Sequence, residues 1–356
     1  MSKLKVAIIF GGKSTEHEIS ILSTKSILKE IDQTKFDLRL IKIDLDGNWF
    51  SLSSLDVDDT EMTPIVLTRG DTVAKILNTT NGQEIDDFEV AFPVLHGTYG
   101  EDGTIQGLLK MCNVAFVGCG VFASSACMDK DFTKRLLRDA GIAIAPYVTF
   151  TSIDQFSYHQ VRKELGSPLF VKPASLGSSV GVRKVDNQQD FEAAILEGFK
   201  YDIKVIVEPS IVGREIECAV LGNDNPKASL PGEVVSNTEF YSFQSKYVDK
   251  DGANIQIPVD LLGHQIQLIR KTAVKAFQAL GCEGLARVDF FFTEDGTAII
   301  NEINTLPGFT NISMYPKMWE ATGITYPELL NLLIALALER YKKEQNLNTV
   351  SPESIN

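Results

Sequence analysis

The chain has 356 residues, of which 44% are hydrophobic and 23% are charged, and its formal net charge at pH 7 is −13. This composition is ordinary for a globular enzyme and excludes a disordered or fibrous chain. The negative charge argues against a nucleic-acid or membrane partner, because there is no basic excess to bind phosphate groups. Small-molecule substrates are favoured instead.

The cysteines and the apolar segments favour a cytoplasmic protein. The five cysteines are odd in number and lack C-x-x-C spacing, which is typical of buried thiols in a reducing compartment. Only five apolar residues, 6–10, precede Gly11-Gly12, too few for the core of a signal peptide. The apolar segment 329–338 is too short to span a membrane, so we expect it to form a buried helix.

The first part of the chain alternates strands and helices. Residues 6–10 predict a buried strand, Gly11-Gly12 a turn and residues 16–30 a helix. Further strands are predicted at 36–44, 90–95 and 115–117, with a polar stretch at 51–63. This order predicts an α/β fold whose N-terminal domain, 1–122, contains an open parallel sheet.

The strand at 90–95 leads into His96-Gly97-Thr98-Tyr99-Gly100-Glu101-Asp102-Gly103. Ligands of open α/β sheets bind beyond the carboxyl ends of the strands, so this loop is a candidate binding loop. The alternative is a glycine-rich turn with an acid that caps a helix.

A second, smaller domain is predicted at 123–213. A helix from residue 123 carries a charge run that includes Lys130, Lys134, Arg135 and Arg138, which we interpret as a solvated face. A helix at 154–165, a strand at 169–173, a helix at 188–200 and a strand at 204–208 follow. Lys172 ends an apolar strand before a Gly/Ser loop at 174–182, which suggests a phosphate site; the alternative is a lysine that reaches solvent at the strand edge.

The third domain, 214–356, is predicted to hold a lid and a hairpin. Strands at 215–221 and 232–235 precede a long polar loop, 236–255, which contains Tyr241, Lys246 and Tyr247. Such a loop is a candidate lid, the alternative being a surface loop without function. Helices are predicted at 260–280 and 326–343.

The hairpin between these helices carries two facing carboxylates. If Asp295-Gly296 forms a two-residue turn, Asp289 faces Glu302 and Arg287 faces Asn304. Carboxylate and amide oxygens in apolar strands suit Mg²⁺ or Mn²⁺, and such a site usually carries nucleotide phosphates. An acidic hairpin that faces water is the alternative.

Six motifs occur together along the chain. They are Gly11-Gly12 with Glu16-His17-Glu18-Ile19-Ser20, L-H-G-x-x-G-E-D-G at 95–103, M-D-K at 128–130, V-K-P-x-x-x-G-S-S-V-G at 171–181, Arg287 to Asp289, and N-E-I-N-T-L-P-G-F-T at 301–310. In this order they resemble the ATP-grasp ligases, and among them the D-alanine:D-alanine ligase family. The resemblance implies three domains, with ATP held between the second and third.

The resemblance also implies binding roles. Lys130, Lys172 and Lys246 would contact the phosphates, and Glu208 and Glu215 the adenosine end, of an ATP site that also includes Ser179, Ile211, Asn301 and Glu302. Asp289, Glu302 and Asn304 would hold two Mg²⁺ or Mn²⁺ ions. The implied reaction transfers the γ-phosphoryl group of ATP to one D-alanine, and the amine of a second D-alanine attacks the acyl phosphate.

The substrate roles come from the same resemblance. Glu16 would bind the ammonium group of the first D-alanine beside His96, with Glu101 supporting the neighbouring loop. Arg287 and the backbone N–H of Gly308 would stabilise the tetrahedral oxyanion. Ser313 and the backbone of Met314 would meet the carboxylate of the second D-alanine.

A hydrogen-bonded link is implied among Glu16, Ser178 and Tyr247, and it would hold the lid closed over the acyl phosphate. Lys246-Tyr247 matches the dipeptide-forming type of lid, whereas Tyr241-Ser242-Phe243 departs from the frequent Y-D-Y pattern. The family suggests a homodimer that supplies peptidoglycan precursors. The alternatives are an ATP-grasp ligase that uses D-serine or D-lactate as its second substrate, and a non-catalytic sensor.

Overall fold

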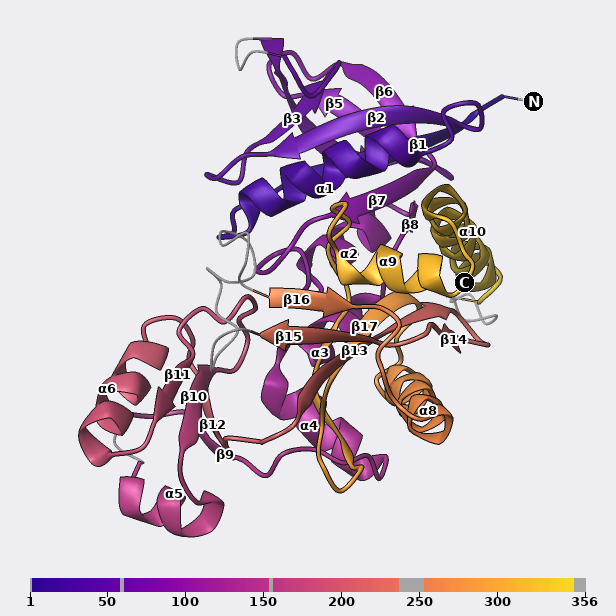
Figure 1. Cartoon of the computed structure of the whole chain (residues 1–356). Coiled ribbons are helices and arrows are strands. Elements are labelled where there is room, and N and C mark those ends of the chain that lie inside the picture. The colour runs from indigo at the N-terminus through magenta and orange to yellow at the C-terminus, as the bar shows by residue number, and fades with distance from the viewer. Residues whose placement is uncertain (1, 58–60, 154–155, 237–252, 349–356) are drawn as a thin grey trace.

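The computed structural model describes residues 2–57, 61–153, 156–236 and 253–348. These residues form three β-sheets with helices packed around them (Figure 1). The predicted α/β fold class is confirmed. Lys246, Tyr247 and Tyr241 lie outside the described residues.

The first sheet has the strand order β6-β5-β4-β3-β2-β1-β7-β8. Its strands are β1 (Leu4–Gly11), β2 (Phe36–Ile43), β3 (Trp49–Leu52), β4 (Thr63–Arg69), β5 (Ala74–Asn78), β6 (Glu84–Phe88), β7 (Val90–Val94) and β8 (Ala115–Phe116). The parallel part, β2-β1-β7-β8, matches the prediction. The antiparallel extension β3 to β6 was missed, because each of these strands is only partly buried.

Two helices belong to the first sheet, α1 (His17–Glu30) and α2 (Thr104–Met111). Each follows a loop at the carboxyl end of a parallel strand, β1 or β7. The loops that carry Glu16 and His96 therefore meet at one edge of the sheet.

The second sheet is antiparallel and has the order β11-β10-β12-β9. It consists of β9 (Val148–Phe150), β10 (Leu169–Pro173), β11 (Arg183–Val185) and β12 (Val205–Pro209), with α5 (Tyr158–Leu165) and α6 (Gln188–Gly198). It has its own core, which includes Val171, Phe191 and Val207.

The third sheet is antiparallel and has the order β16-β15-β13-β17-β18, with β14 paired to β13. Its strands are β13 (Arg214–Gly222), β14 (Lys227–Ala228), β15 (Gly232–Ser236), β16 (Ala253–Gln256), β17 (Gly284–Phe292) and β18 (Ala298–Asn304). Because β16 begins at Ala253, the end of the predicted lid loop is strand. Residues 237–252 of that loop are outside the described residues.

Helices cover both faces of the third sheet. On one face α8 (Gly263–Ala279) packs together with α3 (Val121–Met128) and α4 (Lys130–Asp139), in a core that includes Leu137, Phe277 and Phe290. The single helix predicted from residue 123 is therefore two helices. Asp129 caps the second by accepting hydrogen bonds from the backbone N–H groups of Asp131 and Phe132, at 3.0 and 3.2 Å.

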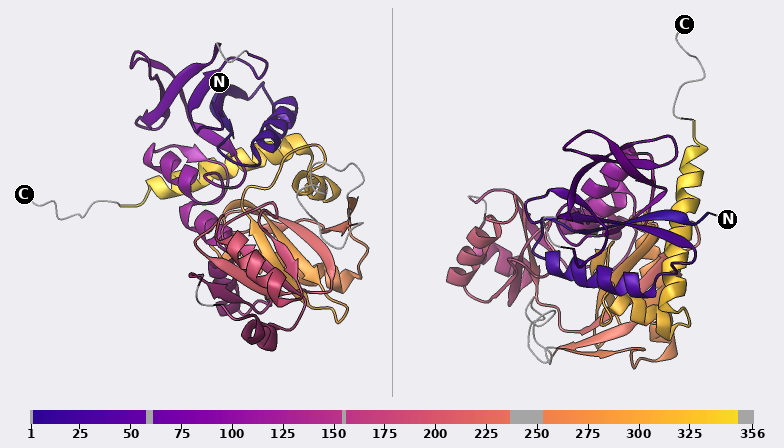
Figure 2. Two further views of the ribbon diagram at one scale, coloured as in Figure 1. Left: turned by 90° about the vertical axis from the view of Figure 1, so that its left-hand side faces the viewer. Right: turned by 90° about the horizontal axis from the view of Figure 1, so that it is seen from above.

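The other face joins the third sheet to the first. Here α9 (Met314–Ala321) and α10 (Tyr326–Gln345) share a core with strands of both sheets, including Val6, Trp319, Leu333 and Leu285. Figure 2 shows α10, in yellow, beside the first sheet. The segment 329–338 is a buried helix, as predicted, whereas α9 was missed.

Among the described residues, no single helix has both the length and the apolar composition of a membrane span. The pair α9 and α10 passes that criterion only together, with a bend of 106° between them. The three sheets support our proposal of domains at 1–122, 123–213 and 214–356, although α3 and α4 pack on the third sheet.

Candidate active site

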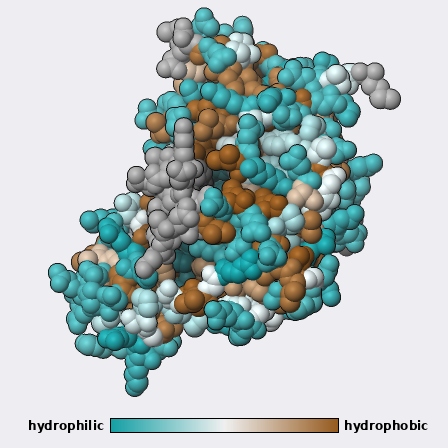
Figure 3. All heavy atoms as spheres, viewed as in Figure 1, coloured by the Kyte–Doolittle hydropathy of each residue, from teal (hydrophilic) through white to brown (hydrophobic). Residues whose placement is uncertain are grey.

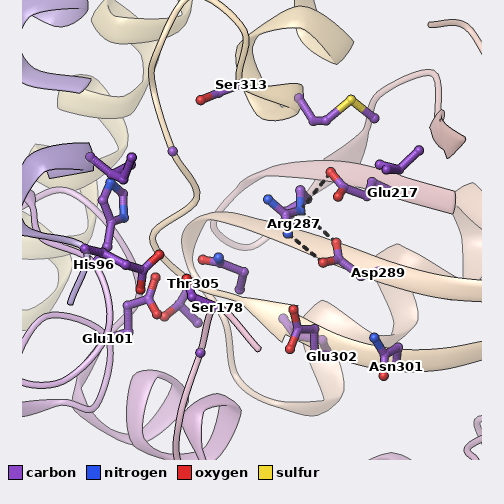
Figure 4. A pocket seen from close by; sticks show the side chains of 18 of the residues that line it. His96, Glu101, Ser178, Glu217, Arg287, Asp289, Asn301, Glu302, Thr305 and Ser313 are labelled. Carbon is purple, nitrogen blue, oxygen red and sulfur yellow. Dashed lines mark hydrogen bonds and ion pairs between the residues drawn. The ribbon is translucent and has the colours of Figure 1, made fainter. Parts of the chain in front are cut away.

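A cavity of about 550 Å³ lies where loops of the three sheets converge. It is lined by residues from α1, the β7–α2 loop, the start of α4, the loop after β10, the third sheet and the segment before α9 (Figure 4). The lining includes most of the predicted site residues: Glu16, His96, Glu101, Lys130, Ser178, Glu215, Arg287, Asp289, Asn301, Glu302, Asn304, Gly308, Ser313 and Met314.

Of the predicted residues that the structure describes, four do not line this cavity, namely Lys172, Ser179, Glu208 and Ile211. Ser179 belongs to the loop whose neighbouring Ser178 does line it. Lys172 and Glu208 lie on β10 and β12, where they bond to each other. The structure thus separates a group of cavity residues from a charged group on the second sheet.

The hairpin of β17 and β18 places its polar side chains by means of a β-bulge. Asp289 pairs with Glu302 and Arg287 with Asn304, as predicted. The predicted two-residue turn is wrong, because Thr293 pairs with Thr297 around a three-residue loop. Asn301 is the extra residue that restores the predicted register.

This bulge decides which side chains of β18 face the cavity. Ala298 and Ile300 are buried before the bulge, and Ile303 is buried after it, so the alternation shifts by one residue. Without the shift Glu302 would share a face with Ile300 and lie in the core. With it, both Glu302 and Asn304 face the cavity beside Asp289.

Arg287 is held by two carboxylates. Its Nε and Nη2 atoms donate to the two oxygens of Asp289 at 2.8 and 2.6 Å, and Nε lies 2.9 Å from Oε2 of Glu217 (Figure 4). Burial opposes the charge, but Asp289 and Glu217 outweigh it and raise the pKa of Arg287 well above its ordinary value. The guanidinium is therefore a fixed cation in the wall of the cavity.

The donor set on the hairpin fits a hard divalent cation. Asp289 and Glu302 supply adjacent carboxylates, and Asn304 supplies an amide oxygen that accepts a hydrogen bond from the Leu306 N–H at 3.0 Å. These are oxygen ligands without histidine or cysteine, the set that Mg²⁺ and Mn²⁺ prefer. A cation there would compete with Arg287 for Asp289.

His96 is buried at the end of β7 and connects the first sheet to the segment before α9. Its Nδ1 lies 3.0 Å from the carbonyl oxygen of Leu306, so Nδ1 carries the proton and donates. Nε2 is 3.5 Å from the hydroxyl of Ser23. Burial lowers the pKa of His96, and the charge of Glu16 opposes this effect only in part.

Glu16 lies between loops of the first and second sheets. A Cβ atom placed on Gly97 would be 3.2 Å from its Oε2 atom, and one on Gly177 would be 3.8 Å away. Burial and the charge of Glu16 raise the pKa of the nearby Glu101 well above its ordinary value. A positive group bound beside Glu101 would favour its ionised form.

Lys130 is the first residue of α4 and points at the loop after β10. Its Nζ donates to the carbonyl oxygen of Leu176 at 2.6 Å, and its backbone N–H donates to that of Ala174 at 3.0 Å. Burial lowers the pKa of Lys130, whereas Glu302 and Glu208 act in the opposite direction. The helix break at Asp129 is thus the local feature that places this lysine.

Glu208 lies between two lysines. Its Oε2 accepts from Nζ of Lys172 at 2.7 Å and its Oε1 lies 2.8 Å from Nζ of Lys134. Burial alone would raise the pKa of Glu208, but Lys172 and Lys134 outweigh it and lower this pKa to about 2. Lys134, predicted to be solvated, is only 1% exposed, and the prediction is wrong for it.

The remaining predicted residues lie in backbone turns at the cavity. Ser178 and Ser179 both have positive φ angles, 54° and 58°, so their backbone bends the loop after β10 sharply. Ser313 Oγ accepts from the Thr310 N–H at 2.9 Å, close to Gly308. Hydrophobic side chains, including the exposed Leu22, Ile255 and Ile312, form part of the wall, and Figure 3 shows apolar residues on this face.

The sequence families described as D-ala D-ala ligase N-terminus and D-ala D-ala ligase C-terminus match residues 5–119 and 136–335. The D-alanine–D-alanine ligase of Proteus mirabilis is 52% identical over 98% of this chain and 99% of that protein. This chain belongs to the D-alanine–D-alanine ligase family. The D-alanine–D-alanine ligase A of Escherichia coli K12 is 49% identical, over 98% of this chain and 100% of that protein.

Solved structures of this ligase family share the fold. The D-alanine–D-alanine ligase of Coxiella burnetii is 40% identical, with a TM-score of 0.86 and 97% of both chains covered. The VanG D-Ala:D-Ser ligase of Enterococcus faecalis is 35% identical, with a TM-score of 0.83 over 94% of this chain and 100% of the other.

Two site residues were missed by sequence reasoning, Glu217 and Lys134. Glu217 is two residues after Glu215, so the period of a strand places both on one face. Lys134 is four residues after Lys130, so a helix places both on one side. The spacing was a usable signal in both cases, but it does not show that the positions are buried.

Proposed function

We propose that this chain joins two D-alanine molecules to D-alanyl-D-alanine with ATP, through an acyl phosphate, and so supplies a precursor of peptidoglycan. The observation that supports this most strongly is that the hairpin carboxylates, Arg287 and Lys130 line the same cavity as Glu16 and His96. Full-length similarity to the ligases of Proteus mirabilis and Escherichia coli supports the substrate.

The residues proposed to act on the phosphate groups lie mainly on the third sheet and at the start of α4. Lys130 lies at the cavity wall, where an ammonium group would neutralise charge on the transferred phosphoryl oxygens. Asp289, Glu302 and Asn304 would hold two Mg²⁺ or Mn²⁺ ions, which neutralise phosphate charge when bound. Glu208 and Glu215, with Lys172, Ser179, Ile211, Asn301 and Lys246, complete the proposed ATP site.

The residues proposed to bind the two amino acids lie mainly in loops of the first sheet and in the segment before α9. Glu16 would accept the ammonium group of the first D-alanine, while His96, with its proton on Nδ1, holds the chain at Leu306. Arg287 and the Gly308 N–H would stabilise the oxyanion that forms when the second amine attacks. Ser313 and Met314 would receive the second carboxylate, and Ser178 and Tyr247 would complete the closed site.

The test is phosphate release by the purified protein with Mg²⁺ and ATP, alone and with D-alanine, L-alanine, D-serine or D-lactate, with product detection by mass. Release that depends on D-alanine, with D-alanyl-D-alanine as the main product, is the expected result. If the main product contains D-serine or D-lactate, the proposed mechanism stands and the second substrate is reassigned. A protein that binds ATP without any release would be a sensor.

The Asp289→Asn variant tests the metal site in the same assay. We expect it to fold normally and to lose turnover, because an amide does not replace the anionic ligand. Asp295→Asn is the matched control and should retain activity, because Asp295 is exposed in the loop of the same hairpin. Full activity of Asp289→Asn would contradict the assignment.

We also propose a cytoplasmic homodimer. Five free, buried cysteines support a reducing compartment, and the dimer rests on the family. Analytical ultracentrifugation of the purified chain measures the oligomeric state directly.

A further inference from the structure

Lys134 is a buried cation outside the cavity. It lies on α4, is 1% exposed, and its ammonium group is 2.8 Å from Oε1 of Glu208 and 5.7 Å from the ring centre of Tyr147. A buried ammonium group is costly unless it is paired. Glu208 is the carboxylate that meets this requirement.

Glu208 in turn connects Lys134 to Lys172. Lys172 and Glu208 share a face of the second sheet, because Phe170 pairs with Glu208 and Lys172 with Ile206. One oxygen of Glu208 contacts each lysine, at 2.7 and 2.8 Å. The Glu208 carboxylate therefore cannot rotate without breaking one of the two ion pairs.

The two sides of this ion-pair group belong to different cores. Lys134 is on α4, whose Leu137 packs in the core of the third sheet, whereas Glu208 and Lys172 are on the second sheet. Lys204 makes a second link between them by pairing with Asp129 at 2.7 Å. The position of the second sheet relative to the third sheet therefore depends on contacts with α4.

We propose that Lys134 is a positioning residue for ATP: it fixes Glu208, and through Glu208 it fixes Lys172, in the orientation that the nucleotide requires. The proposal rests on the proposed function, because it takes Glu208 and Lys172 to be ATP contacts. Lys134 is only 1% exposed and its ammonium group is paired with Glu208, so we expect its removal to change the site through Glu208.

The test compares Lys134→Met with wild type in steady-state dipeptide synthesis. The KM for ATP should rise by about 10- to 100-fold, the range expected when a buried charged group loses a hydrogen-bond partner. The KM for D-alanine and kcat should change much less. Lys134→Arg keeps the charge and should recover most of the affinity for ATP.

Arg138→Gln is the matched control, because Arg138 is an exposed cation four residues further along α4. It should leave the KM for ATP unchanged. Lys134→Met could instead lose activity only because a smaller fraction of the protein is folded, with the KM for ATP unchanged. That result would overturn the proposal and mean that Lys134 has a structural role alone. If the methionine variant does not fold, Lys134→Gln is measured in its place.

A double-mutant cycle tests the route through Glu208. If Lys134 acts through Glu208, Lys134→Met should add little to the effect of Glu208→Gln on ATP affinity. Additive effects would overturn the proposal. Calorimetric titration with ATP in the absence of D-alanine measures the ATP affinity of each variant without turnover. If the wild type binds ATP but makes no dipeptide, that result contradicts the proposed function and leaves the role of Lys134 to be decided by these affinities.

Discussion

At the scale of single residues, the site depends on charges that hold one another in place. Arg287 is fixed by Asp289 and Glu217, and Glu208 by two lysines. Each of these groups is buried or nearly so, and an unpaired charge there would be destabilising. The residues that support the proposed contacts are therefore as necessary as the contacts themselves.

Ionisation of Glu208 should make the free energy of unfolding depend on pH in the acid range. Its pKa in the folded protein, about 2, is below its ordinary value of 4.5. The ionised carboxylate therefore stabilises the fold fully above pH 4.5, and this contribution is lost as the pH falls toward 2. The shift corresponds to about 3 kcal/mol.

We expect Glu208→Gln to lower the free energy of unfolding at pH 7, and the difference from wild type should decrease as the pH falls from 4.5 to about 2. Urea denaturation at each pH measures this. Glu164→Gln, an exposed glutamate on α5, serves as control and should show no such trend. A difference that stays constant with pH would contradict the ionised state assigned to Glu208.

At the scale of elements, irregularities place the functional side chains. The bulge at Asn301 turns Glu302 toward the cavity, and the break at Asp129 puts Lys130 at the first position of a helix. The turn before α9 is equally tight, because a Cβ atom on Gly308 would lie 2.9 Å from Ser313 Oγ. The regular helices and strands hold the bulge, the helix break and the tight turn in their positions around the cavity.

Gly308→Ala should therefore displace Ser313 and weaken the site that we propose for the second substrate. We expect kcat/KM for D-alanine to fall by about 10- to 100-fold, because small displacements of positioning groups are costly. Thermal stability should change little in comparison. Gly263→Ala, at the start of α8 with no atom within 4 Å of the new Cβ, is the control. Unchanged kinetics for Gly308→Ala would mean that the turn adapts freely.

At the scale of the whole molecule, the C-terminal helix returns to the N-terminal sheet. Arg340 on α10 is buried and donates to the carbonyl oxygens of Gly118 and Phe116, with its guanidinium 4.3 Å from the Phe116 ring centre. These partners are more than 200 residues away in sequence. The first sheet and the third domain therefore share one core, which keeps the two halves of the site together.

Arg340→Lys should lower the free energy of unfolding by about 2 to 3 kcal/mol, because one ammonium group does not reproduce two directed bonds and a stacked plane. Urea denaturation followed by circular dichroism measures the change. The kcat of the folded fraction should remain near wild type. Lys342→Gln, an exposed change on the same helix, should have little effect. Equal stability of both variants would show that Arg340 does not join the two regions.

Most elements and the hairpin carboxylates were predictable because their signals are local. The parallel strands β1, β2 and β7 were predicted from the order of strands and helices, β1 as a continuous apolar run, and counting along two strands placed Asp289 opposite Glu302. The count succeeded although the turn was wrong, since the bulge at Asn301 compensated for the longer loop. Two adjacent polar residues, Asn301 and Glu302, interrupt the alternation in β18, but the bulge follows only once the face of β18 that meets the core is known.

The amino-acid sequence by itself determined the α/β class and the ordered motifs, and it supplied the residues that we propose to bind phosphate, metal and amino acid. Only the tertiary structure decided that Lys134 is buried against Glu208, that Glu217 holds Arg287, and that loops of three sheets enclose one cavity. The physical reason is that propensity and spacing act between neighbours in the chain. Burial and charge pairing act between neighbours in space.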